Sequence, residues 1–419
     1  MIPVPQKTRF SPKLIIFLTI IIDSIGYGLI IPLLPFYAQS LNVGSSALGI
    51  LIASFAFMQF LFSPVLGKVS DKIGRKPVLV ISLIISIGSL LVFAFATSFL
   101  ILLFSRILAG LATEGSVAKA YIVDVSDKKD RVSSLGKAGA AHGVGYIIGP
   151  AIGGLLSGFG YTVAGLVAVA ITLVNLCFVI LFLPESMKDK KELNLFKSGK
   201  SVLGSVSSVF GVLKKDSIRN YGKSILDLFK NPGVGIILSI SMLVTLSFST
   251  LPVIIPYLGI AFFGFGASEV SYFFIYLGVI QIVLQGLVIG KLAKRFNEII
   301  LLIVGPLFMG LGMILMPSIA NILVFALSMA VLALSTGIVR TVVPSLITKF
   351  TPEDQRGSVL GLTTSIESIS AVPGSLIGGI LFEYGGLAAP FLTNALLLFL
   401  SFGLGYLFLR VFIKKNEDQ

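Results

Sequence analysis

The chain has 419 residues and a formal net charge of +13, with 55% of its residues hydrophobic and 12% charged. Soluble domains carry about 25% charged residues, so a water-soluble protein is excluded, and intrinsic disorder and a nucleic-acid module fit equally poorly. A single Cys and a single His exclude internal disulfides and metal clusters built on His or on Cys and His, and no cofactor is expected.

Twelve apolar runs of about 20 residues follow one another along the chain. Each is long enough to cross a membrane as a helix, and only helices or closed barrels satisfy the backbone in lipid. The first run is too long and too polar for a cleaved signal peptide. We therefore predict an all-α integral membrane protein with twelve transmembrane helices, at residues 14–38, 47–67, 78–96, 99–124, 134–158, 161–183, 233–258, 269–290, 299–317, 321–347, 358–382 and 387–409.

Lys and Arg are distributed unevenly over the connectors between these runs. The six odd-numbered connectors contain none, whereas 29 of the 32 Lys and Arg residues lie at the termini, in the even-numbered connectors or, for Lys137, in the first turn of the span that follows. Because cytoplasmic loops carry the excess of basic residues, we predict a multi-pass protein of the cell (plasma) membrane with both termini in the cytoplasm. Attraction to anionic membrane lipid then accounts for the net charge without a nucleic-acid partner.

The longest connector, residues 184–232, divides the runs six and six. It predicts an N-terminal six-helix bundle at residues 1–183, a basic cytoplasmic linker, and a C-terminal six-helix bundle at residues 233–419. The linker is interpreted either as helices lying in the cytoplasmic interface or as a flexible chain.

The two halves resemble each other in sequence. A shift of 225 residues brings Arg131–Gly136 onto Arg356–Gly361 and the pair Gly153-Gly154 onto Gly378-Gly379 without gaps. A parallel repeat of six spans predicts two pseudo-symmetric bundles with a central site between them.

Four motifs follow in order in the first half of the chain. They read DSIGYGLIIPLLP (Asp23–Pro35), GKVSDKIGRKP (Gly67–Pro77), RILAG (Arg106–Gly110) and GYIIGPAIGG (Gly145–Gly154). Together they resemble the major facilitator superfamily, and within it the drug:proton antiporters with twelve spans, the tetracycline/proton branch above all. The resemblance is dense over residues 23–160. It implies two six-helix bundles that rock against each other while a small molecule is exchanged for protons.

The second motif contains a candidate conformational latch. Gly74 permits a tight turn, Asp71 can accept hydrogen bonds, and Arg75 can donate to a carboxylate. Asp124, at the end of the fourth span, is the natural partner of Arg75. The resemblance implies that Asp71, Arg75 and Asp124 form a latch that breaks when the halves rock. The alternative is an ordinary basic loop.

The fifth span has a surface of small residues. Gly145, Gly149 and Gly153 recur every four residues, so a neighbouring helix can approach closely, and Pro150 is expected to bend the helix. Packing alone accounts for this pattern, and the resemblance implies that the motif, which ends at Gly154, favours exchange over leak.

The single His, His142, lies in the fifth span as well. An imidazole can titrate near neutral pH. We predict that His142 makes a structural hydrogen bond and does not take part in proton transfer.

Ionisable side chains inside a membrane are costly, so each is a functional candidate. The acids within spans are Asp23, Glu114 and Glu367, and the bases are Arg106, Lys119 and Arg340. Asp23 is interpreted equally as a proton carrier or as a cap for a neighbouring helix. Arg106 and Glu114 are predicted to share one face of the fourth span, where burial favours a protonated carboxyl and the guanidinium favours an ionised one. Lys119 is predicted to lie at the membrane interface.

From these charges we predict that Asp23 and Glu114 couple transport to protons, and that Tyr27, Arg106, Arg340 and Glu367 belong to the substrate cavity. Arg340 lies too deep in the tenth span to be a topology signal. The repeat aligns it with Gly115, beside Glu114. Arg340 is therefore interpreted either as the partner of Glu114 in a cytoplasmic gate or as a structural partner of Glu367.

The predicted function is export of hydrophobic or cationic small molecules in exchange for protons by a monomer, whose partners are its substrate, protons and membrane lipid. No nucleotide-binding motif stands in a cytoplasmic segment, so an ion gradient is the expected energy source. The alternatives are uptake by symport and uncoupled exchange of a metabolite or lipid-like solute. A membrane enzyme is disfavoured, because one His leaves no cluster for acid-base or metal chemistry.

Overall fold

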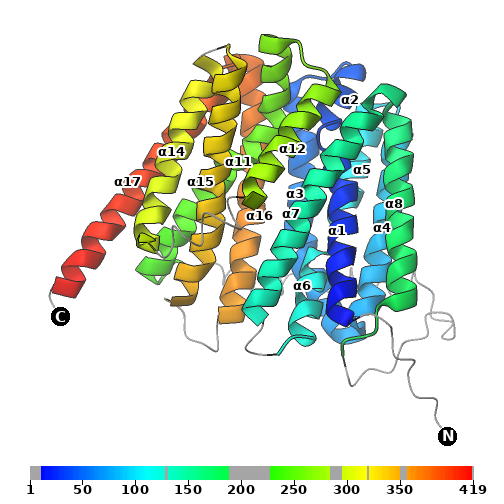
Figure 1. The fold of residues 1–419 in the computed structure, drawn as a ribbon, viewed down its shortest axis with the longest axis horizontal. Coiled ribbons are helices and arrows are strands. Elements are labelled where there is room, and N and C mark those ends of the chain that lie inside the picture. The colour runs from blue at the N-terminus through cyan, green and yellow to red at the C-terminus, as the bar shows by residue number, and fades with distance from the viewer. Residues whose placement is uncertain are drawn as a thin grey trace, which may run out of the picture.

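The computed structural model describes residues 11–127, 131–187, 227–283, 295–318, 320–349 and 356–417. Every long regular element in these ranges is an α-helix, and the helices stand side by side in one bundle (Figure 1). They are α1 (Pro12–Ile30), α2 (Leu34–Ser40), α3 (Ser45–Ile73), α4 (Arg75–Ala94), α5 (Phe99–Leu111), α6 (Gly115–Asp124), α7 (Arg131–Leu156), the 3-10 turn η1 (Ser157–Phe159), α8 (Tyr161–Phe182), α11 (Pro232–Phe263), α12 (Ala267–Val283), α14 (Glu298–Ser318), α15 (Ile322–Lys349), α16 (Arg356–Gly385) and α17 (Ala389–Glu417).

The predicted transmembrane architecture is confirmed. Eleven helical segments of the described residues are long and apolar enough to cross a membrane, and α12 contributes a shorter apolar stretch, Ala267–Ile280. The last part of the predicted eighth span, residues 284–290, lies outside the described residues. The start of α1 and the end of α17 lie at the same end of the bundle (Figure 1). We call this the basic end, because the turn with Lys72, Arg75 and Lys76 is also there, and we call the opposite end the far end.

Two predicted spans are broken rather than continuous. The first span consists of α1 and α2, which are separated by residues 31–33. Pro32 has no N–H for the helical ladder, and Pro35 stands in the first turn of α2, where it is tolerated. The fourth span consists of α5 and α6, separated by residues 112–114. The break sets the position of Glu114.

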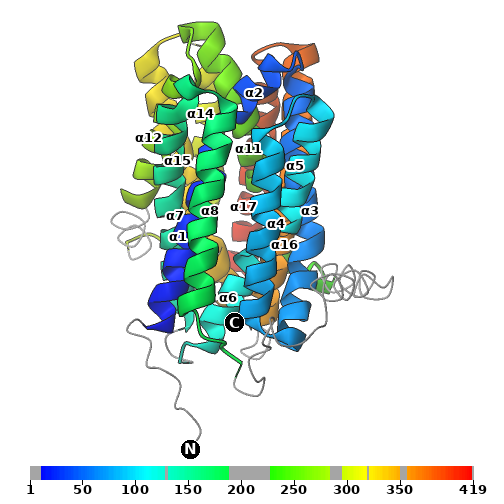
Figure 2. The ribbon, with the colours of Figure 1, turned by 90° about the vertical axis from the view of Figure 1, so that its right-hand side faces the viewer.

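The pairing of the helices repeats after six spans, which confirms two pseudo-symmetric bundles. In the first bundle α1 packs against α7 and α4 against α8, and in the second α11 packs against α16 and α14 against α17. The bundles meet along α3 with α16 and along α7 with α12. In Figure 2, α7 and α12 lie together on the left and α3 lies on the right.

The predicted domain boundaries remain a prediction. Most of the linker predicted at residues 184–232 lies outside the described residues, which end at Met187 and resume at Asp227. Whether the linker forms interfacial helices or a flexible chain stays open, since residues 188–226 lie outside the described residues.

Candidate functional site

A cavity of about 260 Å³ lies inside the first bundle. Its ionisable and aromatic lining comes from α1, from α5 and the break after it, and from α7. These residues are Asp23, Tyr27, Arg106, Glu114, His142 and Tyr146. Four of them, Asp23, Tyr27, Arg106 and Glu114, are site residues that the sequence predicted.

Glu114 enters the cavity because the fourth span is interrupted. The carboxyl stands directly before α6 and is only 5% exposed, and Ser86 donates a hydrogen bond to its Oε1 at 3.4 Å. The prediction that Arg106 and Glu114 share one helical face is wrong, since no continuous helix joins them. The two side chains nevertheless line the same cavity.

The carboxyl groups of Asp23 and Glu114 meet in this cavity. They lie within interaction range of each other, and neither is within 4.0 Å of a Lys or Arg nitrogen among the described residues. Two carboxyl groups in one buried site titrate as a pair, and such a pair can take up and release a proton.

Arg106 and Tyr27 also line the cavity. The Arg106 guanidinium lies 5.3 Å from the centre of the Phe93 ring, and its Nη2 has no hydrogen-bond partner among the described residues. The Tyr27 ring packs between Phe55, at 4.8 Å, and Tyr146, at 5.7 Å. The cavity therefore offers an aromatic surface, a buried cation and two acids.

His142 connects α7 to α1. Its Nδ1 lies 2.6 Å from Ser24 Oγ, a hydrogen-bond distance, and its ring packs against Tyr146 at 4.6 Å. The side chain is exposed, although Lys119 of α6 and Arg340 of α15 both act on it electrostatically. Because residues of both bundles surround it, this exposed surface lies between the bundles rather than against lipid. We call this space the opening.

Arg340 and Glu367 do not line the cavity of the first bundle. Arg340 is exposed, and its guanidinium lies 5.2 Å from the centre of the Phe248 ring. Glu367 accepts a hydrogen bond from Ser241 at 3.4 Å. No carboxylate oxygen of Glu114 or Glu367 lies within 4.0 Å of Arg340, so neither predicted pairing is formed in this structure.

Lys119 lies on α6, after the break in the fourth span. Its side chain is exposed, and Glu367 of α16, in the second bundle, acts on it electrostatically. The predicted place of Lys119 at the membrane interface stays a prediction.

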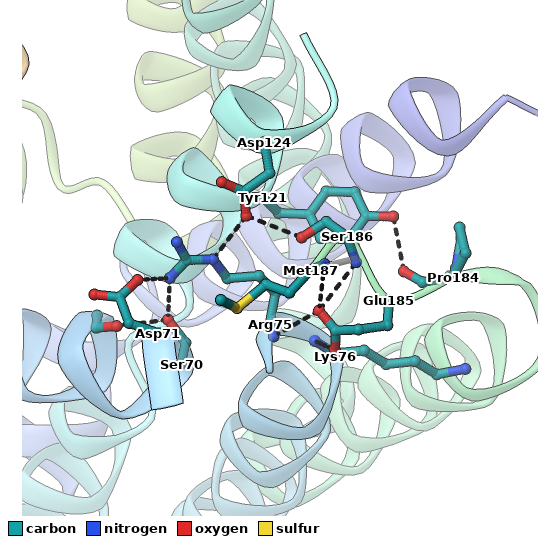
Figure 3. Close-up of polar contacts among 11 residues, drawn as sticks. Ser70, Asp71, Arg75, Lys76, Tyr121, Asp124, Pro184, Glu185, Ser186 and Met187 are labelled. Atoms are coloured by element: carbon teal, nitrogen blue, oxygen red, sulfur yellow. Dashed lines mark hydrogen bonds and ion pairs between the residues drawn. The ribbon is translucent and has the colours of Figure 1, made fainter. Parts of the chain in front are cut away.

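The predicted latch residues come together at the basic end (Figure 3). Arg75 Nη1 lies 2.6 Å from Asp71 Oδ1, and Arg75 Nε donates to Asp124 Oδ2 at 2.9 Å. Arg75 is 8% exposed, whereas the Asp71 side chain is 59% exposed, so the guanidinium is shielded from water on the side of Asp124 more than on the side of Asp71. All three residues belong to the first bundle, where they tie α3, α4 and α6 together.

The sequence analysis missed Glu185 as a part of this cluster. Its carboxylate accepts hydrogen bonds from the backbone N–H of Arg75 at 2.9 Å and of Lys76 at 3.1 Å (Figure 3). A carboxylate is favoured at the N-terminus of a helix, here α4. Gly74 has φ +111°, and a Cβ there would lie 2.6 Å from the Glu185 carboxylate. The available signal was a single acid after Pro184, at the start of a basic connector.

The glycines of the fifth span pack against two different partners. A Cβ at Gly149 would lie 2.7 Å from the Ile25 carbonyl oxygen of α1, and Gly145 and Gly153 also face α1. Gly154 faces Ser271 of α12, in the other bundle. The helix continues through Pro150.

The repeated glycine pair has the same contacts in the second bundle. Gly378 faces Thr250 of α11, within its own bundle, and Gly379 faces Ser45 of α3, in the first bundle. The Gly-Gly repeat found in the sequence therefore marks both contacts between the bundles.

Hydrogen bonds join the two bundles at the far end. Ser45 donates to the Gly379 carbonyl at 3.0 Å, and the Ser46 N–H donates to Glu383 at 2.8 Å. The hydroxyl oxygens of Ser157 and Ser268 lie 2.8 Å apart. The structure is thus closed at the far end.

The chain is similar in sequence and in fold to known membrane proteins. The model of the Major Facilitator Superfamily matches residues 16–374 and 237–418. Multidrug resistance protein 2 of Bacillus subtilis is 26% identical over 405 residues, covering 95% of this chain and 94% of that protein. Tetracycline resistance protein, class H, of Pasteurella multocida is 28% identical over 376 residues, covering 88% and 89%. The crystal structure of the human organic anion transporter MFSD10 superposes with a TM-score of 0.68 at 21% identity, covering 96% of this chain and 100% of that one.

Proposed function

The chain belongs to the Major Facilitator Superfamily, and from this membership we propose that it exports hydrophobic or cationic small molecules in exchange for protons. It is a membrane transporter of small molecules and not an enzyme. Its relatives include proteins named for multidrug and tetracycline resistance, which supports export as the direction of transport.

The observation that carries the proposal is the pair of acids in one cavity. Asp23 and Glu114 are the acids of the first bundle that line it, and no basic group among the described residues neutralises them within 4.0 Å. Burying two carboxyl groups in a membrane protein costs free energy, so such a pair is expected to have a function. A proton on this pair and a cationic or hydrogen-bonding substrate compete for the same carboxylates, and this competition would couple the two fluxes.

The aromatic part of the cavity supports a hydrophobic substrate. The rings of Tyr27, Phe55 and Tyr146 lie together beside the two acids. Aromatic faces attract cations as well as apolar groups. The proton gradient would supply the energy, since each elementary charge that crosses the membrane is worth about 2.3 kcal/mol per 100 mV.

Alternating access would carry the cavity from one side of the membrane to the other. In this structure the bundles are joined at the far end, through Ser45 with Gly379 and Ser157 with Ser268. We propose that the basic end faces the cytoplasm of a plasma-membrane monomer, with both termini and the linker on that side. The structure then corresponds to the state that accepts substrate from the cytoplasm, with the bonds of Asp71, Arg75 and Asp124 formed within the first bundle.

Reconstitution into liposomes with a trapped pH dye tests this function. The wild-type protein is screened against amphiphilic cations such as ethidium, neutral drugs and metabolites, and the Asp23→Asn/Glu114→Gln double variant serves as the control. We expect protons to move opposite to the solute with the wild-type protein alone. Movement in the same direction would indicate uptake by symport, and solute flux without protons would indicate uncoupled exchange. Either result overturns the proposal.

A further inference from the structure

His142 lies between the cavity and the opening. It is one of the residues that line the cavity with Asp23 and Glu114, and its side chain is also exposed in the opening between the bundles. Glu114, in contrast, is 5% exposed. The imidazole therefore stands between the buried acids and the solvent that reaches the opening.

The hydrogen bond of His142 is directed toward the acids. Its Nδ1 lies 2.6 Å from the Oγ of Ser24, which follows Asp23 in α1 and lines the same cavity. Since Nδ1 is used in this bond, Nε2 is the nitrogen left to meet the opening. A cavity of about 260 Å³ has room for several waters, each of which takes about 30 Å³ in the liquid.

The charges around His142 come from four elements. Lys119 of α6 and Arg340 of α15 act on it electrostatically, Asp23 of α1 and Glu114 line the same cavity, and Tyr146 packs beside it in α7. The carboxylates of the cavity are acceptors for a proton that leaves the ring.

We propose that His142 relays protons between the opening and the Asp23–Glu114 pair. A proton from water in the opening binds Nε2, and the proton on Nδ1 passes to Ser24 Oγ. The Ser24 hydroxyl proton passes at the same time, directly or through a cavity water, to a carboxylate. One proton enters and one leaves the ring, and the reverse sequence discharges the acids. This inference rests on the proposed proton coupling and names a further residue for it.

The competing explanation, which is the one predicted from the sequence, is that the His142–Ser24 bond only holds α7 against α1. A relay and a structural bond differ in what they change. A relay sets the rate at which the acids gain protons and leaves their final number unchanged, whereas a structural bond affects packing. General acid-base groups typically contribute 10² to 10⁴ in rate.

The test is the rate of proton uptake by purified protein after a rapid drop in pH, followed with a pH dye and without any transported solute. Proton uptake by the two acids is identified as the kinetic phase that the wild-type protein shows and the Asp23→Asn/Glu114→Gln variant lacks. We expect His142→Gln, which keeps a hydrogen-bonding group, to slow this phase by at least about tenfold. We expect added imidazole to restore the rate in His142→Ala, because a small imidazole can enter an exposed site.

Each result has one meaning. An unchanged rate in His142→Gln, or a slow His142→Ala that imidazole does not restore, overturns the relay while the coupling acids stand. If the wild-type protein and the Asp23→Asn/Glu114→Gln variant take up protons alike, the coupling acids are wrong and the relay fails with them.

Discussion

At the scale of single residues, the cavity brings together side chains that are far apart in the sequence. Asp23 comes from α1, and Glu114 stands at the break between α5 and α6. The family motifs contain Asp23 and Arg106, and both line the cavity. Glu114 was selected only because an acid within a span is costly, and that argument proved sufficient to find it.

The first prediction concerns these two acids. Asp23→Asn and Glu114→Gln should each lower proton-linked transport at least tenfold, of the order expected for loss of an acid-base group, because an amide takes up no proton. Protein abundance should not change. The measurement is solute accumulation driven by a pH gradient in liposomes. Glu269→Gln, an exposed acid at the far end, is the matched control and should transport normally. Accumulation by both neutral variants would place the proton path elsewhere, with Glu367 the next residue to test.

Residue types alone did not reveal Glu185 or the break in the fourth span. Glu185 stands beyond the last residue of the sixth span, and only folding brings it to the N-terminus of α4. Residues 112–114 contain no Pro, so there is no local sign in the sequence that the helix is interrupted there. Local motifs predicted local contacts, such as Arg75 with Asp71, better than contacts across the fold.

At the scale of the elements, the fifth span shows how small residues set the distance between helices. The backbone of α1 lies so close to Gly149 that a Cβ would fall 2.7 Å from the Ile25 carbonyl oxygen and 2.8 Å from Gly28. Both atoms belong to the backbone, which cannot rotate away. The spacing of Gly145, Gly149 and Gly153 predicted a close helix contact, but the sequence did not say that α1 was the partner.

Gly149→Ala should therefore force α7 away from α1. Overpacking a tight contact typically costs about 1–3 kcal/mol, and the purified variant should unfold at a lower temperature than the wild-type protein. Gly139→Ala in the same helix is the matched control, because nothing lies within 4 Å of its added Cβ. Equal melting temperatures for the two variants would show that the contact tolerates a methyl group.

The latch gives the third prediction. Arg75→Gln removes the charge that binds Asp71 and Asp124, so α3, α4 and α6 should hold together less firmly at the basic end. These bonds are formed within one bundle, and closing the basic end requires ordered helix ends there to pack against the second bundle. We therefore expect the loosened variant to close that end less well, which shifts the population toward the state that is open there. The measurement is faster thiol labelling of Lys119→Cys in a Cys177→Ser background. Lys72→Gln, an exposed cation in the same connector, should leave the labelling rate unchanged. Equal rates in the Arg75 variant would contradict the role.

At the scale of the whole molecule, the internal repeat predicted more than the fold. Gly153-Gly154 and Gly378-Gly379 align in the sequence, and each pair packs once within its own bundle and once across to the other. What the repeat could not predict is the state of the transporter. Whether Arg340 meets Glu114 depends on how the bundles are tilted, and here they are joined at the far end with Arg340 exposed. A gate of that kind belongs to the opposite state.

Closure at the far end can be tested by making it permanent. Ser157 Oγ and Ser268 Oγ lie 2.8 Å apart across the contact between α7 and α12. Side chains whose terminal atoms are this near can bring two sulfur atoms to the 2.05 Å of a disulfide by a small rotation. In a Cys177→Ser background, Ser157→Cys/Ser268→Cys should therefore form a disulfide under mild oxidation. Alternating access requires the far end to open, so transport should stop on oxidation and return on reduction. Neither single variant should respond to oxidation, and cross-linked protein that still transports would show that this contact need not separate.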